Sequence, residues 1–249
     1  PDPHGTRSPL AGLLIGFFSW SLGLLGAGLL AGLLVVAVAL AMAYPQLPDV
    51  SDLADYKPKL SMRVFSIEGK QIGEFGEERR KMVPFKDIPT VMKQAVLAVE
   101  DARLYQHGGV DYKGMLRAAL ANLGKVKSQG ASTITQQVVK NEYLAGLPRD
   151  GRYKALQAHY ALMLERKLSK QQILERYFNT VFFGNNAYGL AAAAEVYFGK
   201  KASDLTLLEG AFLMGLVRSP SGYDPIRYPE ASRRRFKQVT LRLAALDLI

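Results

Sequence analysis

An uncharged apolar run near the N-terminus constrains the fold of this chain more than any other feature. No charged side chain lies between Arg7 and Asp49, and residues 10–44 are almost all Leu, Ala, Val, Gly and Phe. A helix needs only about 20 apolar residues to span a bilayer. A secretory signal has a shorter apolar region. Residues 1–44 are therefore predicted to be a short tail and a single transmembrane anchor.

The charges that flank this run predict its orientation. Arg7 lies in the short N-terminal tail, whereas Asp49, Asp52 and Asp55 come first on the other side. Positive charge near a membrane helix favours the cytoplasmic side. We therefore expect a cytoplasmic tail and an extracytoplasmic domain.

The net charge of +10 belongs to that exported part, because Asp2 and Arg7 in the tail cancel. A basic domain favours an anionic partner, and one that is tethered to a membrane meets lipid phosphates before it meets nucleic acid. We expect membrane lipids as partners, and no nucleic acid. The chain has no cysteine, which fits an exported protein that does not rely on disulfides.

Residues 45–83 predict a linker followed by a small β-hairpin. Three prolines and mixed charges come first, and the segment MRVFSIEGKQIGEF then alternates in hydropathy around a turn at Glu68 and Gly69. From Asp87 onward, apolar residues recur at helical spacing nearly to the end of the chain. Residues 84–249 are therefore predicted to form one mainly helical domain.

Glu100, in the segment EDARLYQH, is the first candidate for chemistry. Helical spacing from Val91 to Val99 places Glu100 at the border of an apolar arc. Partial burial there, with Asp101 alongside, would raise the carboxyl pKa and suit a general base. A solvated helix end accounts for the same two acids, and His107 before two glycines also fits a helix-end cap.

A second polar segment, GASTITQQVVKN at residues 130–141, also has two interpretations. A glycine and hydroxyls at a helix start offer free backbone N–H groups to an anion, with Lys140 two turns further on. The same residues also fit an ordinary N-cap, in which Ser132 and Thr133 satisfy backbone donors and the two glutamines face water.

Three motifs together resemble those of the family 51 peptidoglycan glycosyltransferases, found in class A penicillin-binding proteins and in monofunctional enzymes. EDARLYQHGGVD, GASTITQQVVKN and KLSKQQILERYFNTVFFGNNAYGLAAAAEVYFGK occur in the family's order and spacing, and the match covers residues 84–229. The resemblance implies a lysozyme-like, mostly helical fold. It also implies polymerisation of lipid II into β-1,4-linked glycan at the outer face of the bacterial cytoplasmic membrane.

The resemblance assigns a role to each motif. Glu100 aligns with the general base that deprotonates the 4-hydroxyl of the acceptor sugar. The second motif and the basic stretch after it grip the diphosphate and sugars of the donor. The residues expected to bind substrate are Asp101, His107, Ser132, Thr135, Gln136, Gln137, Lys140, Arg152, Lys154 and Gln157.

The chain departs from the family's third motif, which reads roughly Arg-Lys-x-x-Glu. Here Tyr153 replaces the arginine, although Arg152 is adjacent, and Gln157 replaces the second key glutamate. Glutamine forms hydrogen bonds but carries no charge and is a poor metal ligand. Glu175 and Asn179 share one stripe of a helix, and we expect them to support the site from behind. Leu104 replaces an aromatic residue of the first motif, which changes the packing behind that motif.

Partners and cofactors follow from the same resemblance. Lipid II, the growing glycan strand and proteins of cell-wall synthesis are the expected partners. Divalent metal, Mg²⁺ or Mn²⁺, assists some members, but no metal-ligand spacing here establishes a site. Residues 111–129 place Met115, Leu116 and Leu120 along one side, which fits an interfacial helix or a core helix equally well; the resemblance favours membrane contact.

Two rival functions remain open. The first rival is a catalytically weak or inactive membrane-anchored module that binds lipid II as a scaffold, and Gln157 in place of the second glutamate is compatible with it. A lysozyme-like glycan cleaver is the third hypothesis, and the donor-gripping motif argues against it. The abrupt apolar ending, RLAALDLI, suggests a longer protein in which a transpeptidase domain follows.

Overall fold

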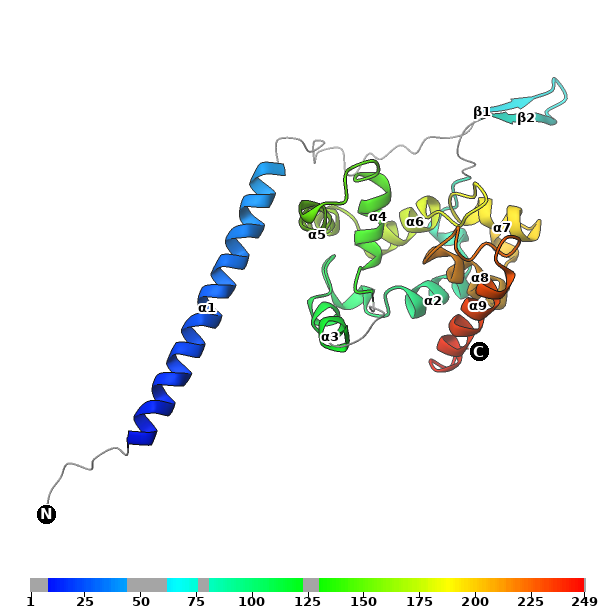
Figure 1. Ribbon diagram of the computed structural model, residues 1–249. Coiled ribbons are helices and arrows are strands. Elements are labelled where there is room, and N and C mark those ends of the chain that lie inside the picture. The colour runs from blue at the N-terminus through cyan, green and yellow to red at the C-terminus, as the bar shows by residue number, and fades with distance from the viewer. Residues whose placement is uncertain (1–8, 44–61, 76–80, 123–129, 249) are drawn as a thin grey trace, which may run out of the picture. The chain divides into compact units, whose positions relative to one another are not determined.

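The computed structural model describes residues 9–43, 62–75, 81–122 and 130–248 (Figure 1). The chain divides into two units. One consists of Pro1–Leu47 with Arg149–Leu156, and the other of Pro48–Pro148 with Gln157–Ile249. Most of the expected linker and the end of the expected interfacial helix, with Leu123, lie outside the described residues. The predicted domain limits at residues 44 and 84 stay predictions.

The N-terminal apolar run forms one helix, α1 (Pro9–Ala43). Within it, residues Leu13–Val38 are long and apolar enough to cross a membrane, since 26 residues at about 1.5 Å each exceed the roughly 30 Å of a hydrocarbon core. Its described leucines, valines and phenylalanines are exposed. Such a surface suits lipid, so the predicted anchor helix is confirmed as a structural element.

The predicted hairpin is also present. Strands β1 (Met62–Phe65) and β2 (Gln71–Phe75) pair antiparallel, with Met62 opposite Phe75 and Val64 opposite Gly73. The register shifts between Val64 and Phe65. Gly69 has a φ of 81° in the turn, a conformation that glycine adopts without steric cost.

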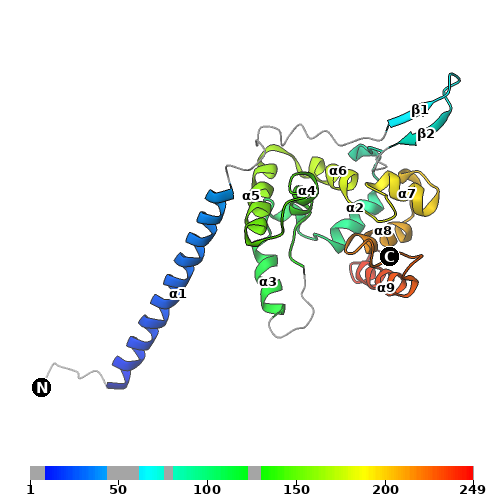
Figure 2. The same cartoon turned by 45° about the horizontal axis from the view of Figure 1, so that its top comes forward.

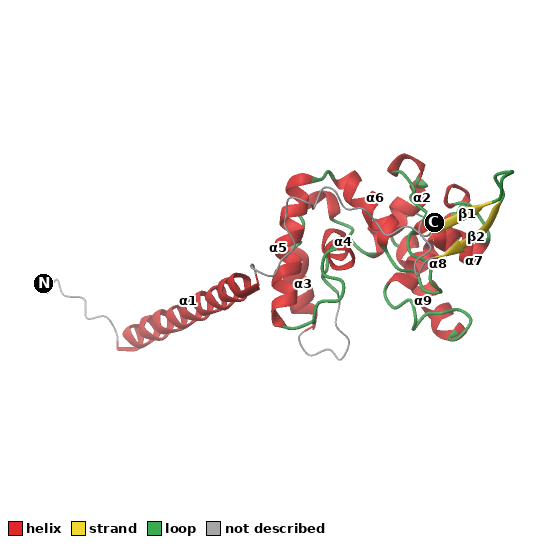
Figure 3. Cartoon of the chain, turned by 90° about the horizontal axis from the view of Figure 1, so that it is seen from above, coloured by secondary structure: helices red, strands yellow, loops and turns green. Residues whose placement is uncertain are grey.

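Helices make up almost all of the remaining described chain, as Figure 3 shows in red. The fold class predicted from the sequence, mainly helical with a small hairpin and one N-terminal apolar helix, is confirmed. These helices are η3 (Phe85–Asp87), α2 (Thr90–Val99), η4 (Leu104–Gln106), α3 (Tyr112–Asn122), α4 (Ile134–Glu142), α5 (Gly151–Lys167), α6 (Lys170–Thr180), α7 (Leu190–Phe198), η5 (Ala202–Asp204), α8 (Leu207–Val217) and α9 (Pro229–Ala244).

Helix α8 is largely buried in the second unit. It packs against α2 and α9, while α4 packs against α6 (Figure 2). Gly210 lets α8 approach α2 closely, because a Cβ there would come within 2.5 Å of the Met92 sulfur. The core that fixes the end of α2 is therefore built from close contacts between helices.

Capping boxes set where α4, α6 and α8 begin, and those of α4 and α6 use a glutamine. Thr133 precedes α4 and Ser169 precedes α6, and each side chain accepts from the backbone N–H three residues on while a glutamine reaches back. The sequence SKQQ contains the serine and the glutamine of the box at Ser169. In α4 the partner is Gln136, which is buried and does not face water.

Candidate active site

A basic groove of about 840 Å³ lies in the second unit, with Glu100 in its lining. Ser132, Thr133 and Gln137 contribute the polar side of the lining. Five arginines also line it, and they outnumber the acids Glu100, Asp101 and Asp111. The groove therefore suits an anionic, sugar-like ligand. The arginines are Arg103, Arg117, Arg218, Arg235 and Arg242.

Glu100 caps the end of α2 and is half-buried. Its Oε2 accepts a 2.8 Å hydrogen bond from Nε2 of Gln137 on α4. Burial raises the pKa of Glu100 above its ordinary value, while the Gln137 bond and the charges of Arg235, Arg218 and Lys140 oppose part of that rise. Such a carboxylate is ionisable yet poorly hydrated, as a general base requires.

The helix ends earlier than the sequence pattern suggests. Apolar residues recur at helical spacing from Asp87 onward, whereas α2 stops at Val99. Asp101 explains the geometry beyond that point, because its buried carboxylate accepts from the N–H of Ile134 (3.0 Å) and contacts Nε2 of His107 (3.0 Å). These contacts join the chain after Glu100 to the start of α4. They thereby bring Gln137 to Glu100.

Residues of the second motif divide into two groups. Ser132 and Gln137 line the groove, and Lys140 is near enough to act on Glu100 through its charge. Thr135 and Gln136 are buried instead. The Thr135 hydroxyl donates to Glu165 (2.5 Å), and Gln136 completes the helix cap. The structure thus gives these two side chains contacts that hold α4, while substrate binding by them stays a prediction.

Gln157, at the position of the missing acid, is also buried at 1% exposure. Its Nε2 donates a 2.7 Å hydrogen bond to the backbone carbonyl of Gln136. The amide therefore ties α5 to α4, next to the residue that contacts Glu100. A carboxylate could not make this bond without taking up a proton.

Gly109 lets the loop after Glu100 pack beneath α5. Its φ is 95°, and a Cβ would come within 2.6 Å of the carbonyl oxygen of Ala161. The carbonyl of the same glycine accepts from the Thr133 hydroxyl at 2.6 Å. Nearby, Lys170 binds both the carbonyl of His107 (2.6 Å) and Glu165 (2.7 Å). The first and second motifs are thus held together by buried polar contacts.

Arg235 is the main site residue that sequence reasoning missed. It stands in a basic run with Arg233, Arg234 and Lys237, a pattern typical of a solvated helix face. Arg235 is half-buried, lines the groove and donates from Nε to the carbonyl of Gly215 (3.3 Å). Helical spacing was the available signal, because Arg235 lies four residues before buried Val239.

Arg218 lines the groove beside Arg235 and was also not singled out. Arg242 extends the basic wall, and its Nε donates to the carbonyl of Ala98 at the end of α2 (3.3 Å). On the opposite side Arg103 forms an ion pair with Asp111. Burial acts to raise the pKa of Asp111, but the ion pair with Arg103 and the hydrogen bond from the Gly114 N–H hold that pKa below its ordinary value.

Arg152 and Lys154 belong to the unit that contains α1. Arg152 pairs with Asp150, with 2.9 Å between Nε and Oδ2, and Lys154 is exposed. Their expected contact with substrate stays a prediction. Within the described residues, no cluster of three or more His, Asp or Glu side chains is arranged to hold a metal.

Glu175 and Asn179 lie on α6 and hold the chain that enters the domain. Asn179 exchanges hydrogen bonds with both backbone groups of Val83 (2.8 and 2.9 Å), and Glu175 accepts from the N–H of Phe85 (2.7 Å). These contacts give both residues a place in the fold, while their expected support of the site stays a prediction.

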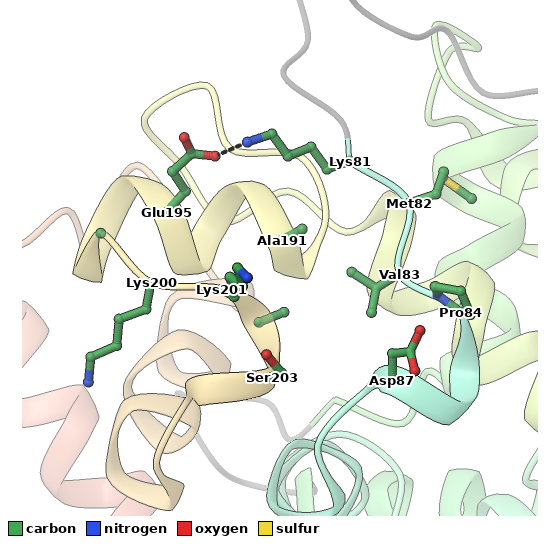
Figure 4. Close-up of a pocket in the computed structure, with 12 residues that line it drawn as sticks. Lys81, Met82, Val83, Pro84, Asp87, Ala191, Glu195, Lys200, Lys201 and Ser203 are labelled. Atoms are coloured by element: carbon green, nitrogen blue, oxygen red, sulfur yellow. Dashed lines mark hydrogen bonds and ion pairs between the residues drawn. The ribbon is translucent and has the colours of Figure 1, made fainter. Parts of the chain in front are cut away.

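A second hollow, of about 450 Å³, shares no lining residue with the groove (Figure 4). It lies between residues 81–87 and the end of α7. Lys81 forms an ion pair with Glu195 across this hollow, and Lys200 pairs with Glu209 of α8. Two lysines of this lining, Lys81 and Lys200, are thus paired with neighbouring carboxylates.

Comparison with known proteins identifies the family. The transglycosylase family model matches residues 68–244. Penicillin-binding protein 1A of Neisseria flavescens is 46% identical over 216 residues, which are 86% of this chain and 26% of that protein. Penicillin-binding protein 1A of Vibrio cholerae is 43% identical over 198 residues, 79% of this chain and 24% of that protein.

The crystal structure of penicillin-binding protein 1A from Haemophilus influenzae matches with a TM-score of 0.44 and 27% identity, over 78% of this chain and 19% of that one. The chain spans about a quarter of the length of the two relatives above. Since the transglycosylase model matches well over half of its residues, the chain belongs to that family, the family 51 peptidoglycan glycosyltransferases.

Proposed function

We propose that the chain polymerises lipid II into β-1,4-linked glycan strands, with Glu100 as the general base. The observation that carries this proposal is the half-buried carboxylate of Glu100, held by Gln137 inside a groove lined by arginines. Family membership supports the reaction class. The residues supply the roles that the reaction needs.

Glu100 takes the proton of the acceptor sugar's 4-hydroxyl. The oxygen then attacks the anomeric carbon of the lipid-linked donor from the face opposite the diphosphate. The bond between that carbon and the diphosphate oxygen breaks, and its electron pair leaves with the diphosphate. A β-1,4 bond forms with inversion, and Glu100 ends protonated. Oε2 is held by Gln137, which leaves Oε1 to meet the hydroxyl.

Cations stabilise the leaving diphosphate, whose negative charge grows as the glycosyl bond breaks. Lys140, Arg218 and Arg235 all act on Glu100 through their charge, so they surround the reacting centre. Ser132, which lines the groove just before α4, is proposed to add a hydroxyl to this binding site. Arg152 and Lys154 are proposed to add charge from the following stretch.

No step of the proposed reaction uses a metal ion. The family's second acid is Gln157 here, and its amide is engaged with the Gln136 carbonyl. A neutral amide is a weak ligand for Mg²⁺ or Mn²⁺ compared with a carboxylate. The chain's own cations are therefore proposed to carry the charge stabilisation that a divalent ion assists in some relatives.

The domain is proposed to work at the outer face of a bacterial cytoplasmic membrane, anchored by a single pass of α1. Helix α3 supports contact with lipid, because Met115, Leu116 and Leu120 are 46%, 63% and 61% exposed while Gly114 and Ala118 face inward. Of the two arrangements left open by the sequence, this exposure favours the interfacial one. Lipid II, the growing strand and proteins of cell-wall synthesis are the proposed partners.

Polymerisation of labelled lipid II by the purified full chain in detergent tests the proposal. Wild type is expected to form long glycan and Glu100→Gln none. Glu230→Gln is the matched control, because Glu230 lies exposed on α9 and pairs only with Arg233 among the described residues. If both wild type and Glu100→Gln bind labelled lipid II without making glycan, the chain is a binding module, the second candidate that Gln157 favours.

A further inference from the structure

Tyr177 on α6 carries a buried hydroxyl that the fold does not use. Its side chain is 0% exposed, and its hydroxyl has no hydrogen-bond partner among the described residues. Leaving a buried hydroxyl unpaired costs free energy, and a phenylalanine would fill the same space without that cost. The hydroxyl therefore requires a reason beyond packing.

The nearby acid is Glu100. Burial raises the pKa of Tyr177 well above its ordinary value, and the negative charge of Glu100 raises it further. The contact between helices fits, because α6 packs against α4 and α4 carries Gln137, the donor to Glu100. Tyr177 is fully buried and is not among the residues that line the groove.

The carboxylate has room for a second donor. Oε2 of Glu100 accepts one hydrogen bond, from Gln137, and a carboxylate oxygen can accept two. Oε1 accepts none from the residues that the structure describes. A donor on the buried side would occupy Oε2 and leave Oε1 for the sugar hydroxyl.

We propose that Tyr177 is a positioning residue for Glu100: when the Glu100 carboxyl is ionised, its Oε2 accepts from the Tyr177 hydroxyl as well as from Gln137, with or without substrate. This inference rests on the proposed function. This bond would also satisfy the buried Tyr177 hydroxyl, which has no other partner among the described residues.

The other groups that face Glu100 are charged: Lys140 on α4, Arg218 after α8 and Arg235 on α9. A bound diphosphate neutralises part of their field, so their support of the ionised base weakens once substrate is present. A neutral donor keeps its effect. Tyr177 therefore matters most in the substrate complex, which is the state that the pH dependence of kcat reports.

Tyr177→Phe tests this role through the pH profile of kcat in lipid II polymerisation. Loss of a donor to the ionised form makes Glu100 harder to deprotonate, so the acid limb moves to higher pH. At a pH on that limb the rate should fall by roughly tenfold, with the alkaline plateau changed by less than about twofold. Thermal unfolding should be unchanged or shifted upward, because an unpaired hydroxyl is removed.

Tyr197→Phe is the matched control. The Tyr197 hydroxyl donates to the carbonyl of Phe183 (2.8 Å), so its loss should lower stability without moving the acid limb. A second variant keeps the hydroxyl: 3-fluorotyrosine at position 177 is a stronger donor and should move the limb to lower pH. If both variants at Tyr177 give the wild-type profile, the proposal is wrong.

A separate measurement distinguishes this failure from failure of the proposed function. Carbon-13 NMR of labelled glutamate follows the titration of Glu100 in the full chain without any need for activity. Tyr177→Phe should raise the pKa of Glu100, and Tyr197→Phe should not. An unchanged titration in Tyr177→Phe would overturn the positioning role, even if wild type polymerises lipid II.

Discussion

Gln137 and Glu100, which are far apart in the sequence, meet through a 2.8 Å hydrogen bond between Nε2 and Oε2. The bond joins the second motif to the first, so a segment expected to bind the donor also contacts the proposed base. Among the effects that lower the pKa of Glu100, this bond is the largest, and only burial outweighs it.

Gln137→Met removes this donor while nearly keeping the side-chain volume. The pKa of Glu100 should rise, because burial is then opposed by the cations alone. The acid limb of kcat/KM should move to higher pH, and the rate at a pH on that limb should fall by roughly tenfold or more. Gln238→Met, which alters another glutamine of the groove lining, controls for lost polarity. A pH profile of kcat/KM equal to that of wild type would contradict the effect of Gln137 on the pKa of Glu100.

Glu100→Gln should make the protein more stable at neutral pH although it removes the proposed base. Because burial holds the native pKa of Glu100 above its unfolded value, the group's contribution to stability is fully present below the unfolded pKa and lost as pH rises through the native one. Relative to wild type, Tm should therefore rise by about 2–4 °C at pH 8. The difference should shrink at pH 4. A variant less stable than wild type at pH 8 would argue against burial of the charge.

Asp101→Ala should weaken both the fold and the reaction. The Asp101 carboxylate accepts from the Ile134 N–H and contacts His107, so its loss leaves a buried N–H and a buried imidazole nitrogen without this partner. We expect a loss of about 1–3 kcal/mol in urea unfolding, and slower polymerisation because α4 is no longer fixed against Glu100. Exposed Asp204 provides the control variant, Asp204→Ala. Equal midpoints for the two variants would show that Asp101 does not join these segments.

Gln157→Glu restores the family's acid, yet we expect it to harm this chain. The Gln157 amide donates to the Gln136 carbonyl at 2.7 Å, and a carboxylate there would place two acceptors together in a buried site. Stability should fall by about 1–3 kcal/mol near neutral pH, and less in acid, where the new carboxyl is protonated. Gln157→Met separates loss of the donor from addition of charge. Faster polymerisation by Gln157→Glu at pH 7 would show that the missing acid limits the reaction.

The sequence predicted the elements of this fold better than their contacts. Local signals were enough for α1, the hairpin and the capping box at Ser169, because apolar length, alternation and cap chemistry act over a few residues. The end of α2 at Val99 was not predicted from the sequence. Its stop at Val99 follows from the bonds of Asp101 to α4, a contact between distant segments that no local pattern contains.

The same limit applies to the site. Glu100 was predicted at the edge of burial from helical spacing alone, and it is half-buried. A run of basic residues such as Arg233, Arg234 and Arg235 is typical of a solvated helix face. Arg233 and Arg234 are exposed, whereas Arg235 is half-buried. Only the packing of α9 on α8 places one arginine of that run in the groove.

The central claim is that Glu100 removes the acceptor proton, and a single-turnover measurement of the first glycosidic bond tests it most directly. With lipid II at saturation, Glu100→Gln should slow bond formation by roughly 10²- to 10⁴-fold while lipid II binding stays within a few fold of wild type. If Glu100→Gln forms the bond at a rate within tenfold of wild type, another group takes the proton and the account is wrong.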